Sequence, residues 1–118
     1  MRQLSELLFE RKVNSPTISS GTLTLNLATG RYFKVTLDAN VTTLTFSNVP
    51  SGVDCTVDLK LVQDATGSRT FAWPASVKWA NGYIPTVTAT ASNYDIFTLH
   101  TDDGGTTWSG FIGGQRFV

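Results

Sequence analysis

The chain has 118 residues, and its nine basic and nine acidic side chains leave no net charge, with only 15% of all residues charged. That length allows a single domain around one hydrophobic core. The absence of a basic patch argues against nucleic acid as a partner. Glu6, Glu10 and Arg11 interrupt the apolar N-terminal stretch, and nothing approaches the roughly 20 apolar residues of a membrane span. We therefore expect synthesis in a cytoplasm and no membrane partner.

Residues 1–20 are predicted to form an arm that is distinct from the rest of the chain. Leu4, Leu7 and Leu8 fall on one helical stripe, which predicts a short amphipathic helix over residues 2–12 followed by a linker. A helix of about three turns is only marginally stable alone. We therefore expect the arm to make assembly contacts, on its own body or on another chain, through Leu4, Leu7, Leu8 and Phe9.

From residue 21 onward, apolar and polar residues alternate with period two, which predicts β-strands. Further strands are predicted at 69–73, 77–79, 86–90, 94–101 and 106–112, with turn signals between them. Residues 21–118 are therefore expected to form an all-β domain of seven to nine strands, an antiparallel β-sandwich or jelly-roll-like barrel. The inward positions are predicted to be Leu23, Leu25, Leu27, Phe33, Val35, Leu37, Leu44, Phe46 and the odd-numbered residues from Val53 to Leu61.

No pattern in the sequence predicts catalysis. His100 is the only histidine, and no nucleophile elbow is present. Asp54 and Asp58 share one face of a predicted strand, but four strand residues separate them by roughly 13 Å, which is too far for a pair of glycosidase carboxylates. We therefore expect no enzyme activity and no cofactor.

Cys55 and the pair Asp102 and Asp103 also have structural interpretations. Cys55 is the only cysteine and occupies an inward strand position, which predicts a buried, unreactive thiol. The two aspartates precede Gly104 and Gly105, as in a hairpin turn. A cation bound to Asp102 and Asp103 stays an alternative, although no third acidic residue supports it.

The segment FAWPASVKWANG, residues 71–82, concentrates rigid aromatic surface. Pro74 cannot donate to a strand ladder, so a strand is expected to end at Trp73. Trp73, Trp79 and Tyr83 form a possible aromatic contact surface. Core packing or subunit contact is the favoured interpretation, and a platform for a sugar is the alternative.

Three segments together resemble a β-module of bacteriophage and prophage virion proteins. They are QDATG (63–67), WPASVKW (73–79) and DGGTTWSGF (103–111), and the resemblance extends over residues 21–118. Such modules occur in tail-fibre-like and tail-spike-like proteins and in small head proteins. The resemblance implies a non-enzymatic virion structural protein that is made in the cytoplasm of the bacterial host and forms a homotrimer.

Within that family, the main prediction is a capsid decoration (cement) protein that binds the major capsid protein as a trimer. Only about twenty residues precede the module, which favours the head over a fibre with a long shaft. The alternative is a tail-fibre or tail-tip module or adaptor that contacts tail or baseplate proteins and a host-surface glycan.

Overall fold

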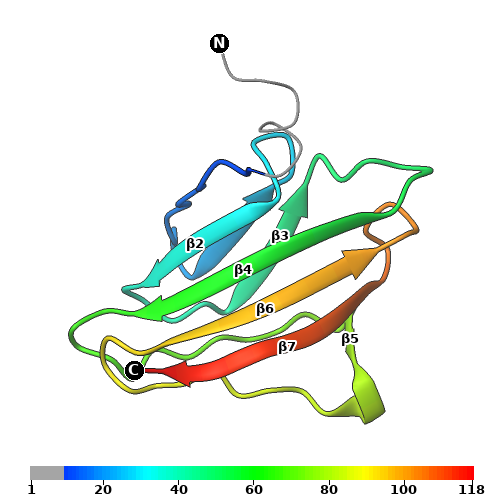
Figure 1. Ribbon diagram of the computed structural model, residues 1–118. Helices are drawn as coiled ribbons and strands as arrows, with labels where there is room; N and C mark the ends of the chain where they lie inside the picture. The colour runs from blue at the N-terminus through cyan, green and yellow to red at the C-terminus, as the bar shows by residue number, and fades with distance from the viewer. Residues whose placement is uncertain (1–9) are drawn as a thin grey trace.

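The computed structural model describes residues 10–118, and within them the chain is almost entirely strand and loop (Figure 1). The predicted arm contacts Leu4, Leu7, Leu8 and Phe9 lie outside the described residues. Glu10 to Lys12, predicted as the end of the arm helix, are not helical, so that part of the prediction is wrong. The elements are β1 (Thr22–Asn26), β2 (Tyr32–Leu37), β3 (Thr43–Ser47), β4 (Cys55–Gln63), β5 (Val77–Trp79), the 3-10 helix η1 (Ala80–Gly82), β6 (Tyr94–Thr101) and β7 (Trp108–Phe117).

The strands form a two-stranded sheet, β1-β3, and a five-stranded sheet in the order β2-β4-β6-β7-β5. Successive strands from β1 to β4 alternate between the two sheets, so β1 pairs with β3, and β2 with β4, in parallel. β5 is also parallel to β7, whereas β6 is antiparallel to both β4 and β7. The prediction of an antiparallel, jelly-roll-like arrangement is therefore wrong for three of the described pairings. The chain crosses to the other sheet after β1 and again after β2, so the strands that pair run in the same direction. The prediction failed because period-two alternation is the same in parallel and antiparallel strands.

One hydrophobic core lies between the two sheets, and most predicted inward positions are in it. Cys55 is buried, as expected, at 6% exposed. Phe46 is only partly buried but stacks on Trp108, with ring centroids 4.3 Å apart. Val53 precedes β4 and is 53% exposed, so its inward assignment is wrong. The confirmed positions, each no more than 4% exposed, are Leu23, Leu25, Leu27, Phe33, Val35, Leu37, Leu44, Val57, Leu59 and Leu61.

Two predicted strands, at 69–73 and 86–90, are instead loops whose backbone bonds to buried side chains. The Gln63 amide donates to the carbonyl oxygens of Arg69 and Thr88, both at 2.9 Å, and accepts from the Arg69 N–H at 3.1 Å. The fully buried Asp95 carboxylate accepts from the backbone N–H groups of Thr88 and Arg116, each at 2.8 Å. Apart from a single parallel bridge between Phe71 and Val41, side chains provide these hydrogen bonds, and neither segment forms a strand.

No helix among residues 10–118 is both long enough and apolar enough to cross a membrane.

We expect Asp95→Ala to lower the free energy of unfolding by about 2–4 kcal/mol, because each donor left without its buried partner costs about 1–3 kcal/mol. Urea denaturation measures this change. The matched control is Asp38→Ala, which removes an exposed carboxylate and should change stability by less than about 0.5 kcal/mol. An Asp95→Ala variant as stable as that control would contradict the anchoring function of Asp95.

Candidate functional site

The aromatic residues of segment 71–79 pack against one another inside the molecule. The Trp73 ring lies 4.5 Å from Phe71 and, edge-on, 4.9 Å from both Trp79 and Phe97, measured between centroids. Trp79 is 7% exposed, and Trp73 is partly buried against the core. Edge-to-face pairs of this kind contribute about 0.5–1.5 kcal/mol beyond the area they bury. Both indoles therefore act in packing within this chain.

Gly110, the last glycine of the DGGTTWSGF segment, allows Trp79 to lie close to β7. Val77 and Trp79 of the edge strand β5 lie opposite Trp108 and Gly110 of β7. A Cβ atom at Gly110 would come within 2.7 Å of the Trp79 ring carbons. Only a residue without a side chain leaves room for the indole on this backbone.

Exposed apolar side chains gather at the same edge of the five-stranded sheet. Tyr83, which follows η1, is 68% exposed, and Phe111 and Ile112 of β7 are 56% and 43% exposed. These three residues, with Trp79, Ala80 and Gly110, line a hollow of 200 Å³. We call this group of six residues the apolar edge surface. Contiguous exposed apolar surface commonly marks a contact site on a soluble protein.

The three predicted contact residues lie in different surroundings in the structure. Tyr83 projects from the apolar edge surface, Trp79 forms part of the floor of its hollow, and Trp73 lines a different hollow with Phe71 and Ile84. Phe111 and Ile112 were not among the predicted contact residues. Strand alternation predicts an outward position for only one of these two neighbours, because adjacent residues in a strand point to opposite faces.

The histidine and the acidic residues do not converge on a catalytic arrangement. His100 Nε2 lies 3.6 Å from Asp54 Oδ2 at the surface. Asp58 accepts hydrogen bonds from the Arg11 guanidinium and the Thr98 hydroxyl, both at 2.6 Å. Among residues 10–118, no group of three or more histidine, cysteine, aspartate or glutamate side chains is placed to hold a metal ion. The absence of enzyme activity stays a prediction.

Asp103 closes the turn between β6 and β7. Its Oδ1 accepts from the backbone N–H of Thr107 at 2.9 Å and from the Thr101 hydroxyl at 3.0 Å. The backbone hydrogen bond from Thr107 is the main cause that lowers the pKa of Asp103. The Asp103 carboxylate is thus engaged in hydrogen bonds within its own turn. Within the described region, no group of three acidic, histidine or cysteine side chains supports the alternative of a cation at Asp102 and Asp103.

Asp64 organises the QDATG turn in a similar way. Its Oδ1 accepts from the N–H groups of Thr66 and Gly67, at 3.1 and 2.9 Å, and its Oδ2 pairs with the Arg69 guanidinium at 3.1 Å. The hydrogen bond from Arg69 is the largest cause that lowers the pKa of Asp64. Gly67 has φ +72°, and a Cβ there would meet the backbone of Ala89 and Ala91 within 3.0 Å. The Asp64 and Gly67 residues of the QDATG segment therefore stabilise this turn.

The Asp64 turn predicts a pH-dependent contribution to stability. Because the folded-state pKa is lowered, the stabilisation is present above the ordinary carboxyl pKa of about 3.9 and is lost as the pH falls through the folded-state value. We expect Asp64→Asn to lower the free energy of unfolding at neutral pH, and the gap to the wild-type protein to narrow under acid conditions. Urea titrations across this range test it, with exposed Asp38→Asn as the control. A gap of constant size would contradict the prediction.

Comparison with known proteins gives one family. A family model described as "Putative phage tail fibre C-terminal domain" matches residues 17–106, well over half of the chain. The match runs from before β1 to beyond β6 and includes the QDATG and WPASVKW segments. No curated protein and no solved structure matches the chain.

Proposed function

Because the chain belongs to this family of phage tail fibre C-terminal domains, we propose that it is a non-enzymatic structural module of a bacteriophage tail fibre. The family match over residues 17–106 carries the proposal. It supports a component of the virion, and it favours the tail-fibre alternative over the capsid decoration protein that was the main prediction from sequence. Assembly into the virion would follow synthesis in the bacterial cytoplasm.

The way the polar side chains are used supports a binding module rather than an enzyme. Asp64 and Asp103 each close a turn, and Asp95 anchors a loop, so their carboxylates are engaged in holding the backbone. His100 sits at the surface beside Asp54. By contrast, Tyr83, Phe111 and Ile112 are large, apolar and exposed, as in surfaces that make contacts with other proteins.

The location on the particle is the direct test of the proposal. Virions that contain this chain are labelled with gold-conjugated antibodies raised against it, and electron microscopy records where the gold lies. We expect gold on the tail fibres, because the family match is to a tail fibre domain. The same antibody absorbed with purified protein is the control. Gold distributed over the head would contradict the proposal and restore the capsid decoration interpretation.

We further propose that the module is a homotrimer and that the apolar edge surface lies between the copies. Burying one large apolar side chain contributes about 1.5–3 kcal/mol, and each copy would bring Tyr83, Phe111 and Ile112 to the contact. Trp79 and Gly110 form the base of this surface, and the close fit between them keeps it fixed in shape before any partner arrives. A preformed surface loses less conformational entropy on association.

We expect Tyr83→Lys and Phe111→Lys to convert a trimer to monomers, because each would place a charge in an apolar contact. Sedimentation velocity gives the oligomeric state, and far-ultraviolet circular dichroism shows that the fold is retained. Thr56→Lys is the matched control, since Thr56 is also an exposed strand residue but lies on β4. A wild-type monomer at high micromolar concentration would exclude the trimer, and trimeric variants would exclude this surface as its interface.

A further inference from the structure

The turn that follows β5 contains the only asparagine of the sequence that is followed by a glycine, Asn81–Gly82. In this order the backbone nitrogen of the glycine can attack the side-chain Cγ atom of the asparagine, because the glycine has no side chain that obstructs the approach. The attack requires the asparagine side chain and the backbone on either side of it to rotate. The surroundings of the pair in the folded chain therefore decide whether the reaction occurs.

The structure leaves this pair free to rotate. Asn81 and Gly82 belong to the three-residue 3-10 helix η1, in which no residue is buried. The Asn81 side chain makes no hydrogen bond to any of the residues 10–118. A Cβ atom at Gly82 would meet no other atom within 4 Å, so the glycine lies in open space. Because a 3-10 turn has poorer hydrogen-bond geometry than an α-helix, little resists a local opening here.

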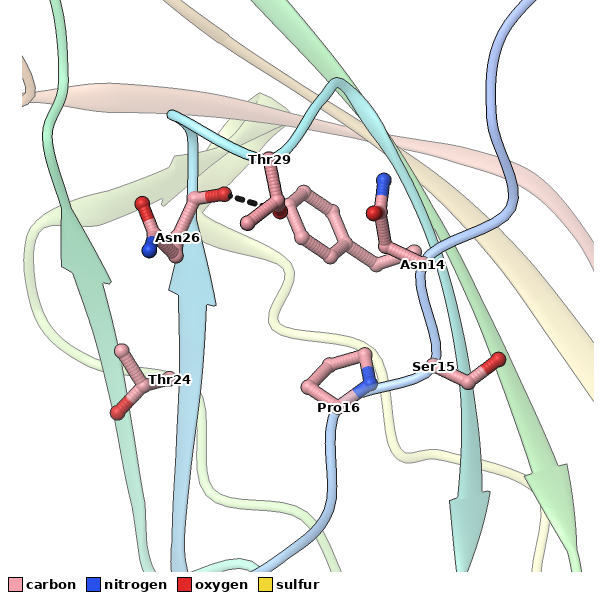
Figure 2. A pocket seen from close by; sticks show the side chains of 7 residues that line it. Asn14, Ser15, Pro16, Thr24, Asn26 and Thr29 are labelled. Atoms are coloured by element: carbon pink, nitrogen blue, oxygen red, sulfur yellow. Dashed lines mark hydrogen bonds between the residues drawn. The ribbon is translucent and has the colours of Figure 1, made fainter.

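The other asparagines are held in place or buried. Asn14, which Figure 2 shows beside Ser15, donates from its side-chain amide to the Tyr32 carbonyl at 3.1 Å. Asn93 is 9% exposed and is followed by the large residue Tyr94. The asparagines whose side chains are hydrogen-bonded are Asn14, Asn26, Asn40 and Asn48. Asn81 thus combines an exposed, unbound side chain with a following glycine, and the other asparagines do not.

We propose that Asn81–Gly82 is a site of spontaneous deamidation in the folded protein. The Gly82 nitrogen loses its proton to solvent and forms a bond to Asn81 Cγ, while the side-chain amide nitrogen leaves as ammonia after taking a proton from water. The product is a five-membered succinimide ring. One water molecule then opens the ring at either carbonyl and gives aspartate or isoaspartate at position 81. Solvent water is the only co-reactant, and nothing is oxidised or reduced.

The reaction alters the apolar edge surface, because Ala80 and Tyr83 flank the pair and both line the hollow of that surface. Either product carries a negative charge where the amide was neutral, and a charge beside an apolar contact loses hydration when a partner covers it. Isoaspartate also adds one backbone carbon between Ala80 and Tyr83, and the Tyr83 N–H donates to the Ala80 carbonyl across this turn at 3.1 Å. We therefore expect deamidation to weaken association through this surface. This consequence rests on the proposed trimer, whereas the deamidation itself does not.

The test of the reaction is incubation of the full chain in mildly alkaline buffer made with ¹⁸O-water, followed by peptide mapping in ordinary water. Fragment spectra should show a gain of about 3 Da at Asn81, because an NH₂ group is replaced by an ¹⁸O-labelled hydroxyl. An asparagine that reacts only during the digestion gains about 1 Da, so the label separates the two events. We expect Asn81 to react at least about tenfold faster than Asn14, because the residue after Asn81 has no side chain.

Asn14, followed by Ser15, is the matched control within the same molecule, and the chain unfolded in urea is the reference for an unprotected Asn81. Equal rates at Asn81 and Asn14 in the folded protein would overturn the proposed site. Labelling of Asn81 in urea without labelling in the folded protein would overturn it too, because it would show that the fold protects the turn.

The effect on association is tested with Asn81→Asp, which supplies one of the two products directly. We expect it to weaken association in sedimentation velocity by about tenfold, a change of 1.4 kcal/mol. Asn81→Gly is the matched control, because it removes the amide without adding a charge and accepts the positive φ of 57° at this position. Equal association of the two variants would overturn the effect on the apolar edge surface. A monomeric wild-type protein would overturn the trimer and this effect together, and ¹⁸O at Asn81 would still establish the deamidation.

Discussion

Two buried polar side chains, Gln63 and Asp95, hold the loops at 69–73 and 86–90. Loop backbone that enters a core must find hydrogen-bond partners, because unpaired buried groups are costly. Gln63 at the end of β4 bonds to both loops that follow it, and Asp95 near the start of β6 connects the second loop to the end of β7. These bonds hold the first loop beside the core, where Phe71 and Trp73 join the aromatic cluster.

The aromatic cluster in turn determines the shape of the β5 edge. Trp79 is held between the Trp73 ring and the Gly110 backbone, so β5 is fixed beside β7 although it has only three residues. The chain leaves β5 through η1, which brings Tyr83 next to Phe111 and Ile112. The tryptophans therefore support the apolar edge surface from beneath, while Tyr83, Phe111 and Ile112 provide its exposed part.

Sequence reasoning succeeded where side-chain alternation alone decides the outcome. The inward positions of β1, β2 and β4 follow directly from period two, as does the burial of Cys55. Strand direction could not be obtained in the same way, because parallel and antiparallel strands bury their residues with the same period. The loop at 86–90 was mistaken for a strand because Val87 is buried between two more exposed threonines. The hydrogen bonds of the Thr88 backbone go instead to Gln63 and Asp95, which are distant in the sequence. The hollow lined by Asn14, Thr24 and Phe33 combines three separate segments, so no local pattern could predict it.

The strand order places the apolar edge surface and the hollow lined by Asn14, Pro16 and Thr24 at opposite edges of the five-stranded sheet. β5, with the apolar edge surface, forms one end of the order β2-β4-β6-β7-β5, and Asn14 pairs with β2 at the other end (Figure 1). Copies that associate through the β5 edge would therefore leave the hollow beside β2 open.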